Sequence, residues 1–370
     1  MLLGTMRMIS LFLCLFMLLI SSLGMNCTAT NESQLDRASV GTALMSNATA
    51  AAEIADYVQM NISSQESSEN AEAFWSLEGY DRIQLPRMGR ILQDNQTSQD
   101  LLLPEELAVY SRGMPLQGKI EFSREQVPFK IPSEPGINVC IAPLSLAVYL
   151  AGDLANVQLS EEAICTEAVV MDGAENDGAA KKANLSFSIA SDRTAERRSG
   201  LYALYALDGN RSSIAPAQAF ILTEGEAVLQ MEDSIPSENE FIKINLSTGT
   251  EDNRTKIFAA AIMPRKEYDN ATMRLVANES KAWPVVALSI GNRSTEIEVN
   301  PATAQDQLMS MISLLPDNSA ISMQEATLSA VDLIFLTDGS WVKGEYVIVC
   351  AIYSPEVGLQ GLKQKIVEVI

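Results

Sequence analysis

The chain contains no histidine, and this absence decides which catalytic chemistries its residues can perform. Ser-His-Asp and Cys-His mechanisms, histidine proton shuttles and histidine metal ligands are all excluded. Any catalysis would therefore rest on carboxylates, lysine, tyrosine or cysteine.

Two patterns among these residue types resemble catalytic arrangements. Ser340-Trp341-Val342-Lys343 matches the Ser-x-x-Lys motif of penicillin-binding serine acyltransferases, but the companion motifs Ser-Asp-Asn and Lys-Thr-Gly are missing. Glu105-Glu106 and Glu161-Glu162 are adjacent pairs that do not converge on one point, whereas the two carboxyl groups of a glycosidase lie about 5–10 Å apart across a cleft. We therefore assign no catalytic residue, and a carboxylate pair assembled from distant segments stays open.

The sequence offers few metal ligands. The chain has neither histidine nor a Cys-x-x-Cys motif, which argues against a zinc site. The acidic segment Asp172–Gly178 could hold calcium, although it lacks the alternating ligand register of an EF-hand, and a solvated loop is the simpler interpretation. We expect no metal and no cofactor.

Four cysteines follow the apolar N-terminal run: Cys27, Cys140, Cys165 and Cys350. An even number in an exported chain favours disulfides, with three connectivities available. We predict a bond between Cys140 and Cys165. Buried free thiols are the alternative, because Cys350 lies among Val and Ile.

Asn-x-Ser/Thr sequons are the most specific functional signal. Twelve of the nineteen asparagines begin one, where random placement of Ser and Thr would give roughly three. This number predicts an exported, N-glycosylated protein. The candidate glycosylation sites are Asn26, Asn31, Asn47, Asn61, Asn95, Asn184, Asn210, Asn245, Asn253, Asn270, Asn278 and Asn292.

Two long stretches carry no sequon, from Ser98 to Ala183 and from Thr295 to Ile370. Glycans require exposed asparagine, so a sequon-free stretch is either buried core or a contact surface. Both stretches contain strong strand patterns, which favours core, and an assembly face is the alternative.

The N-terminus predicts a secretory signal peptide. Arg7 precedes the apolar run Ile9–Leu23, and the small residues before and at Gly24 suit cleavage there. An uncleaved anchor is the alternative, and the residues before Cys27 form a poor lipobox. We expect an extracellular or cell-surface location, with no transmembrane anchor after cleavage.

The net charge limits the kinds of molecule that the chain is expected to bind. The chain has 47 acidic and 26 basic residues, a net charge of −21. Binding to nucleic acid or to anionic lipid would need clustered Lys and Arg, so both are disfavoured. Cell-surface proteins or glycans, and self-assembly, remain as expected partners.

The strongest strand pattern runs from Trp341 to Tyr353 and becomes apolar on both faces. This predicts a central strand of a packed two-layer structure. Its Gly-x-Tyr start resembles the tyrosine corner of immunoglobulin-like sandwiches and is repeated at Gly200-Leu201-Tyr202. The repetition is compatible with a diverged duplication.

Short strand patterns punctuated by Pro and Gly fill most of the chain after Leu116. They predict a mainly β protein with two β-sandwich, immunoglobulin-like domains after a helical or irregular N-terminal region. The expected divisions are a signal peptide at 1–24, the helical or irregular segment at 25–113, a first sandwich at 114–236 and a second at 237–370. Helices are predicted at 48–60 and 303–314.

Two stretches resemble secreted surface proteins of methanogenic archaea. One is Trp341–Tyr353 with its tail Ser354–Leu359, and the other is Phe258–Pro264 followed by Tyr268. The resemblance covers about residues 237–370. It implies N-glycosylated, acidic, tandem β-sandwich modules in a cell envelope, and no catalytic residues.

These observations favour an extracellular, N-glycosylated structural or adhesion protein of the cell envelope, without catalysis. An extracellular carbohydrate-binding protein, or a carbohydrate-active one that uses carboxylates, is the alternative. Aromatic residues make up 6% of the chain and only three are Trp, so platforms for stacking sugars are few.

Overall fold

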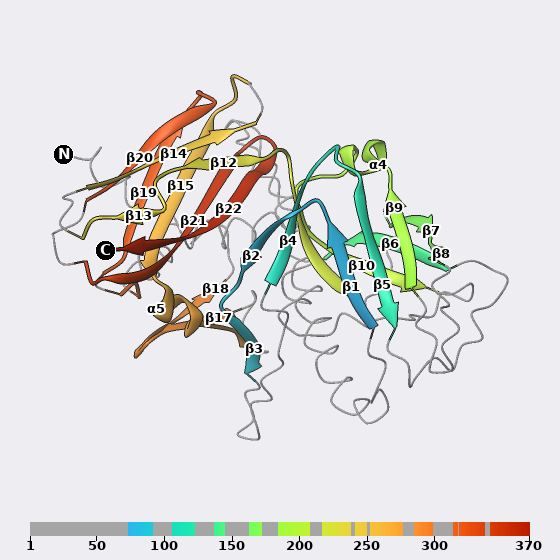
Figure 1. Ribbon diagram of the computed structural model, residues 1–370, viewed down its shortest axis with the longest axis horizontal. Helices are drawn as coiled ribbons and strands as arrows, with labels where there is room; N and C mark the ends of the chain where they lie inside the picture. Colours follow the sequence, from blue (N-terminus) through green and yellow to red (C-terminus); the bar gives the residue numbers. More distant parts are fainter. Residues whose placement is uncertain are drawn as a thin grey trace, which may run out of the picture.

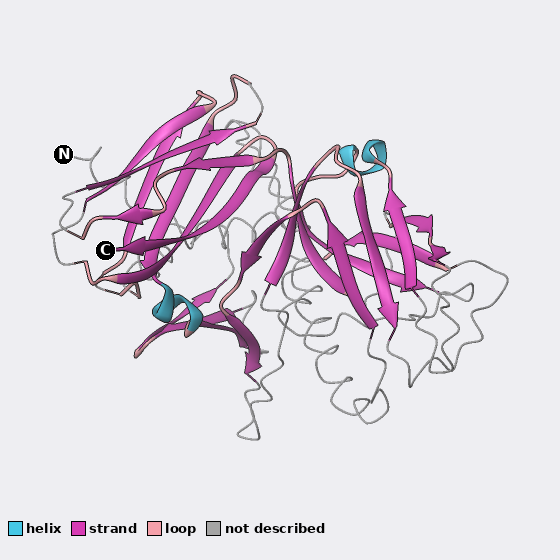
Figure 2. Cartoon of the chain, viewed as in Figure 1, coloured by secondary structure: helices cyan, strands magenta, loops and turns pink. Residues whose placement is uncertain are grey.

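The computed structural model describes residues 73–91, 106–122, 137–144, 163–171, 184–207, 217–237, 241–249, 252–276, 285–298, 314–316, 318–336 and 341–370. These residues form five β-sheets and two short helices, so the described protein is mainly β (Figure 2). The predicted signal peptide and the helix at 48–60 lie outside the described residues, as does all but Leu314 of the helix at 303–314.

Two sheets, at the right in Figure 1, form the first sheet pair. One sheet has the order β1-β5-β9-β8: β1 (Ala73–Glu78), β5 (Leu116–Phe122), β9 (Asn184–Ile189) and β8 (Val169–Met171). The other has the order β2-β4-β11-β10-β6-β7: β2 (Asp81–Gln84), β4 (Glu106–Ser111), β11 (Gln218–Thr223), β10 (Gly200–Leu207), β6 (Asn138–Pro143) and β7 (Ile164–Glu167).

Two further sheets form the second sheet pair. One has the order β12-β14-β20: β12 (Ala227–Gln230), β14 (Phe241–Thr248) and β20 (Ala330–Leu336). The other has the order β13-β22-β21-β15-β19: β13 (Ser234–Ile235), β22 (Gly358–Val369), β21 (Gly344–Ser354), β15 (Lys256–Pro264) and β19 (Ala320–Ala326).

A small sheet completes the described fold, with the order β18-β17-β16-β3: β18 (Arg293–Glu298), β17 (Val285–Ile290), β16 (Thr272–Val276) and β3 (Arg87–Ile91). β16 to β18 follow β15 in the chain, whereas β3 arrives from the N-terminal side and pairs with β16 in parallel. Helix α4 (Ser191–Ala195) connects β9 to β10, and helix α5 (Arg265–Asp269) connects β15 to β16.

Each sheet pair encloses a core because side chains alternate between the two faces of a strand. In β10, Tyr202 and Leu204 point into the core between the first two sheets. In β21, Ile348 and Cys350 point into the core of the second pair. β21 lies between β22 and β15 in its sheet, which confirms the prediction that this stretch is a central strand.

Both Gly-x-Tyr motifs form the expected hydrogen bond. The Tyr202 hydroxyl donates to the carbonyl of Arg198 at 2.8 Å, and the Tyr346 hydroxyl donates to the carbonyl of Val342 at 3.0 Å. In both cases the carbonyl lies four residues upstream, before the strand begins. Each tyrosine therefore ties the start of a central strand to the loop that precedes it.

A third core joins the two sheet pairs, and we call it the shared core. It contains Leu201 and Ala203 from the outer face of β10, and Ala351 and Leu362 from the outer faces of β21 and β22. The small sheet adds Met273 and Leu288 among others. In Figure 1 the sheet pairs accordingly lie side by side along the long axis, with the small sheet beside the second pair.

The predicted helical or irregular segment at 25–113 is wrong where the structure describes it. Residues 73–91 and 106–111 form β1 to β4. A turn at Gly79, where φ is +70°, interrupts the alternation. Trp75 and Leu77 pack on one core, whereas Ile83 and Leu85 belong to another, so no single period runs through 74–85.

The strand pairings also cross the predicted division at residue 236. β12 and β13 precede residue 237 in the chain, yet they pair with β14 and β22 of the second sheet pair. In the described part of the chain, the connection between the sheet pairs lies after Thr223, the last residue of β11, and before Ala227, the first of β12.

Candidate functional site at the junction of the sheet pairs

Several described polar residues make contacts where the two sheet pairs meet, and we call this region the junction. The connecting residues there are Glu224, Gly225 and Glu226. The backbone N–H of Glu224 donates to the carbonyl of Leu359 at 2.9 Å, and that of Gly225 donates to the carbonyl of Gln360 at 2.8 Å. The connection is therefore fixed onto the first residues of β22.

A β-bulge in β22 presents these two carbonyls. Tyr353 of β21 pairs with Leu359 and Ile352 pairs with Gly361, so Gln360 is the extra residue. A side chain at Gly361 would lie 2.7 Å from the backbone nitrogen of Ala227, which explains the glycine there. The Gln360 side-chain amide is buried, with no hydrogen-bond partner among the described residues.

Arg112 of the first sheet pair contacts the connecting residues 224–226, which we call the linker. Its guanidinium forms an ion pair with Glu224 and donates two hydrogen bonds to the carbonyl of Ala195, at the end of α4. Both members of the ion pair are mostly buried, with 28% and 16% of their side chains exposed. A partly buried, multiply bonded arginine holds its geometry better than a surface pair does.

A second set of contacts joins β2 to β22. The Lys363 ammonium forms an ion pair with Asp81 at 2.5 Å. The backbone N–H of Gln84 donates to the Gln364 side chain at 2.6 Å, and the Gln364 amide donates to the Gln84 carbonyl at 3.3 Å. The hydroxyl of Tyr268 in α5 donates to the same carbonyl, and burial raises the pKa of Tyr268 above its ordinary value.

The hairpin between β21 and β22 makes the third contact. The Ser199 hydroxyl, just before β10, donates to the carbonyl of Val357 at 3.0 Å. Gly358 follows with φ of +88°, and a side chain there would lie 2.5 Å from the Ser199 hydroxyl oxygen. The junction therefore consists of close, specific packing around backbone groups.

A buried lysine marks the start of β15, at the end of the sheet where β21 turns into β22. The Lys256 side chain is fully buried, and its ammonium bonds the Asp252 carboxylate at 2.5 Å and the Asp252 carbonyl at 2.8 Å. Arg254 also pairs with Asp252. Partial burial alone would raise the pKa of Asp252, but the hydrogen bonds from Lys256 and Arg254 outweigh it and lower the pKa to about 2.

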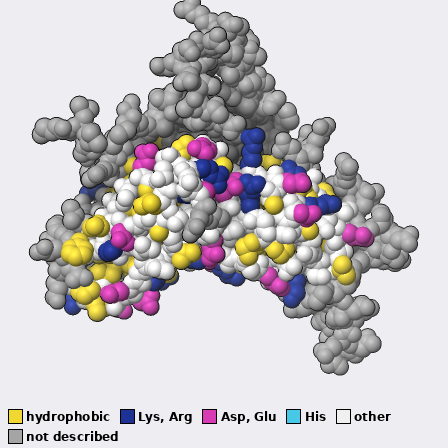
Figure 3. Space-filling model, turned by 90° about the horizontal axis from the view of Figure 1, so that it is seen from above, with side chains coloured by type: hydrophobic (Ala, Val, Ile, Leu, Met, Phe, Trp, Pro, Cys, Tyr) yellow, Lys and Arg dark blue, Asp and Glu magenta, His cyan; other side chains and the backbone are white. Residues whose placement is uncertain are grey.

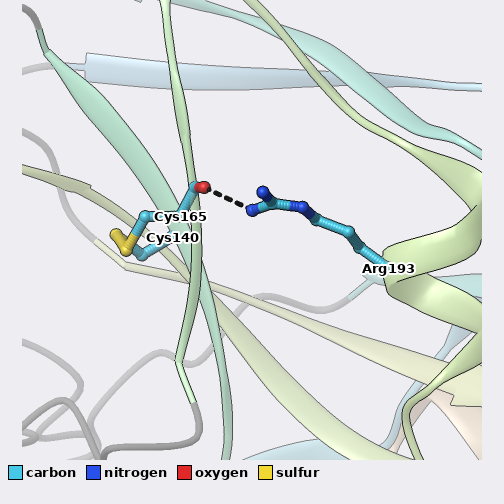
Figure 4. Close-up of a disulfide and its surroundings, with 3 residues drawn as sticks. All are labelled: Cys140, Cys165 and Arg193. Carbon is cyan, nitrogen blue, oxygen red and sulfur yellow. Dashed lines mark hydrogen bonds between the residues drawn. A yellow bond between two sulfur atoms is a disulfide. The ribbon is translucent and has the colours of Figure 1, made fainter.

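The structure contains the disulfide predicted between Cys140 and Cys165 (Figure 4). The two residues face each other across the antiparallel strands β6 and β7. Arg193 of α4 donates to the carbonyl of Cys165 at 3.0 Å. Cys350 is a buried free thiol, and burial raises its pKa. Cys27 lies outside the described residues.

The predicted glycosylation sites within the described residues occupy different surroundings. Asn253, Asn270 and Asn292 are exposed and lie in turns or at the end of a helix. Asn245 lies within β14, and Asn184 begins β9. Asn26, Asn31, Asn47, Asn61, Asn95, Asn210 and Asn278 lie outside the described residues.

The patterns considered for catalysis or metal binding do not meet in the described structure. Lys343 is exposed, and Ser340 lies outside the description, as do Glu105, Glu161-Glu162 and the acidic loop after Met171. Glu106 forms an exposed ion pair with Arg82. Where residues are described, no three Cys, Asp or Glu side chains gather in a metal-binding group.

Sequence reasoning did not identify the junction residues. The signal available was the pair Gly358 and Gly361 inside an otherwise strand-like segment, since isolated glycine in a strand indicates a bulge or a close approach. Nothing in the sequence marks Gln84, Arg112 or Glu224 as partners of that segment.

No helix in the described chain is long and apolar enough to cross a membrane.

Comparisons with known proteins identify no family. No family model matches the chain, and no curated protein matches it. Similar solved structures include a Salmonella alpha-2-macroglobulin mutant (9% identity, TM-score 0.25) and red sea bream transglutaminase (11% identity, TM-score 0.26). The alignments cover 83% and 84% of this chain but only 15% and 33% of those proteins.

A smaller domain is also similar in part. The C-terminal domain of the Streptococcus pyogenes antigen I/II-family protein AspA aligns over 81% of this chain and all of its own length, at 7% identity and a TM-score of 0.20. These scores are too low to support an inference about this protein, so its function has to be argued from its own residues.

Proposed function

We propose that this protein is an extracellular, N-glycosylated structural or adhesion protein of the cell envelope, without catalytic activity. The observation that carries the proposal is the shared core, which joins both sheet pairs and the small sheet. The hydrogen bonds from Glu224 and Gly225 to β22 reinforce it. Such a body is suited to transmitting load or presenting a surface, because its modules cannot swing apart freely.

We further propose that each sheet pair is an immunoglobulin-like β-sandwich. In the first pair, the order β1-β5-β9-β8 matches strands A-B-E-D, and β11-β10-β6-β7 matches G-F-C-C′. In the second pair, β12-β14-β20 matches A-B-E, and β22-β21-β15-β19 matches G-F-C-C′.

Two details repeat between the pairs and support this assignment. The tyrosine corners lie at the start of β10 and β21, which are both F strands in this comparison. β4 and β13 each run parallel beside the G strand, β11 and β22 respectively. The repetition of both details also supports descent of the two pairs from a duplicated module.

Three observations support an extracellular location. The Cys140–Cys165 disulfide is the kind of bond that persists in oxidising compartments. Asn253, Asn270 and Asn292 are exposed, as glycosylated residues must be. The N-terminal sequence has the pattern of a signal peptide. The partners in this proposal are cell-surface proteins, glycans or further copies of the chain.

A carbohydrate-binding or carbohydrate-active protein receives less support. Trp341 is buried and stacks on Tyr346 with ring centroids 4.9 Å apart, so it contributes to a core. Trp75 packs edge-on against Phe187 at 5.7 Å. Neither ring is placed as an open platform for a sugar, and Trp283 lies outside the described residues.

Fractionation of cells that make the protein naturally tests the proposal. We expect the protein in the envelope fraction, carrying glycan, and inactive on a panel of glycan substrates. Recovery as a free monomer in the medium that cleaves members of the panel would overturn the proposal and favour the carbohydrate-active alternative.

A further inference from the structure

One sheet of the second pair exposes apolar side chains that a folded sheet normally buries. The outer face of β12-β14-β20 consists of the residues that alternate with the buried ones: Val228, Gln230, Phe241, Lys243, Asn245, Ser247, Ala330, Asp332 and Ile334. Phe241 is 57% exposed and Ile334 is 53% exposed. Figure 3 shows hydrophobic side chains gathered at the end of the molecule formed by the second sheet pair.

A glycosylation sequon, Asn245-Leu246-Ser247, lies in the middle of the same face. Leu246 is buried in the second core, so Asn245 and Ser247 point outward. Asn245 is paired directly opposite Asp332 of β20 and opposite Gln230 of β12. Its side chain thus starts from the central strand of the sheet.

The hydrogen bonds of Asn245 fix the direction of the atom to which a glycan would be attached. The Asn245 Nδ2 donates to Asp332 Oδ1 at 3.0 Å, and Asp332 also pairs with Lys243 at 2.8 Å. The Nδ2 therefore points toward β20. After glycosylation this nitrogen keeps one hydrogen, which leaves it able to donate to Asp332.

The exposed apolar residues lie within reach of that position. Ile334 follows Asp332 by two residues on β20, which places it about 7–8 Å from Asn245 as a diagonal neighbour. Phe241 precedes Asn245 by four residues on β14, about 14 Å along the strand. An oligosaccharide that starts at Nδ2 and runs over β20 passes Ile334 first and reaches Phe241 with its later sugars.

We propose that a glycan on Asn245 covers the outer face of β12-β14-β20 and shields Phe241 and Ile334 from self-association. The inference rests on the proposed function, which supplies the glycosylation. In the transfer, Nδ2 bonds to the anomeric carbon of a phosphate-activated oligosaccharide and loses a proton. The bond from that carbon to the phosphate oxygen breaks, and the carrier phosphate leaves with the electron pair.

The surroundings of the other described sequons make Asn245 a specific choice. Asn253, Asn270 and Asn292 lie in turns or at a helix end, where a glycan extends into solvent. Among the sequons whose side chains are described, Asn245 alone lies within a strand, beside exposed apolar residues of a sheet face. Loss of this glycan should therefore have a consequence that loss of the others lacks.

Three variants test the proposal in the natural host. Ser247→Ala removes the sequon while keeping Asn245 and its hydrogen bond to Asp332. Ser247→Thr keeps the sequon and controls for changes at that position, and Ser294→Ala removes the sequon of Asn292 in the β17–β18 turn. The measurements are glycopeptide mapping by mass spectrometry, sedimentation velocity and the fluorescence of a hydrophobic dye.

We expect Asn245 to be occupied in the wild type. Ser247→Ala should raise dye fluorescence at least twofold and shift the protein toward oligomers, whereas Ser247→Thr and Ser294→Ala should match the wild type. If Ser247→Ala does not fold, adding Phe241→Gln and Ile334→Gln should restore a soluble monomer, and failure to do so overturns the proposal.

Three other results would also overturn the inference, and they differ in what they say of the function. An empty Asn245 beside occupied Asn253 and Asn292 contradicts the shielding proposal alone, as does an occupied Asn245 whose removal changes nothing. If none of the sequons is occupied in the native protein, the proposed glycoprotein function fails as well.

Discussion

Tyr202 and Tyr346 show how one hydroxyl can define the start of a strand. Each ring packs in the core of its own sheet pair, and each hydroxyl reaches the carbonyl four residues upstream. The carbonyl is thereby satisfied where no ladder partner is available. The same device in both pairs makes the two tyrosines equivalent in their roles.

Removing either hydroxyl should lower stability without changing the fold. We expect Tyr202→Phe and Tyr346→Phe each to reduce the free energy of unfolding by about 1–2 kcal/mol, because a carbonyl loses its hydrogen bond while the ring still fills the core. Urea unfolding measures the change. Tyr80→Phe is the matched control, since Tyr80 contributes ring contacts with Tyr110. An equal loss of unfolding free energy in Tyr80→Phe would contradict the stabilising role of the Tyr202 and Tyr346 hydroxyls.

Asp252, whose side chain is 19% exposed, should be a carboxylate whose loss destabilises the second sheet pair strongly. Asp252→Asn leaves the fully buried Lys256 ammonium without its counter-charge, which should cost about 2–4 kcal/mol. Asp233→Asn is the control, because Asp233 is 92% exposed beside Lys365 and its loss should leave the unfolding midpoint unchanged. A matching effect of both variants would argue against a special role for Asp252.

The stabilisation from Asp252 also has a defined pH range. Its pKa in the folded protein is about 2, below the ordinary value of 3.8. A lowered pKa means that the stabilising effect is fully present above about pH 4 and is lost as the pH falls toward 2. The difference in unfolding free energy between wild type and Asp252→Asn should therefore shrink over that range, as urea titrations at several pH values would show.

At the scale of elements, the hairpin of β21 and β22 is the part that most depends on glycine. Gly358→Ala should destabilise the protein by about 1–3 kcal/mol, because φ is +88° and the new methyl group meets the Ser199 hydroxyl. The control Gly249→Ala has its nearest atoms at 3.8 Å. Adding Ser199→Ala to Gly358→Ala should recover part of the loss, and strict additivity would contradict the predicted clash.

The disulfide stabilises the pairing of β6 with β7. Cys140 and Cys165 are separated by 25 residues, so the bond should contribute about 3 kcal/mol by restricting the unfolded chain. A double Cys→Ser variant measured by thermal unfolding tests this estimate. Cys350→Ala provides a comparison, since it changes a buried thiol without opening a bridge; an unchanged melting temperature in the double variant would contradict the prediction.

The sequence predicted individual strands better than it predicted the contacts between sheets. β14 was identified because its residues alternate with a period of two, whereas β10 and β21 were identified as apolar runs that begin with Gly-x-Tyr. β1, β2 and β4 were missed because their apolar residues pack in different cores. The junction was not predictable, since contacts such as Gln84 with Gln364 depend on how sheets pack, which local sequence does not encode.

At the scale of the whole molecule, the shared core is the feature that holds the two sheet pairs together. It draws on the outer face of β10, on β21 and β22, and on the small sheet, while the linker is held by backbone hydrogen bonds. Opening the junction would expose these apolar residues to water and break the ion pair between Asp81 and Lys363. We therefore expect the two sheet pairs to unfold together.

Differential scanning calorimetry tests this claim most directly. We expect a single transition for the native protein, with a calorimetric enthalpy equal to the van't Hoff enthalpy. Two separate transitions, each assignable to one sheet pair, would show that the pairs fold independently and would contradict the shared core as the basis of a single rigid body.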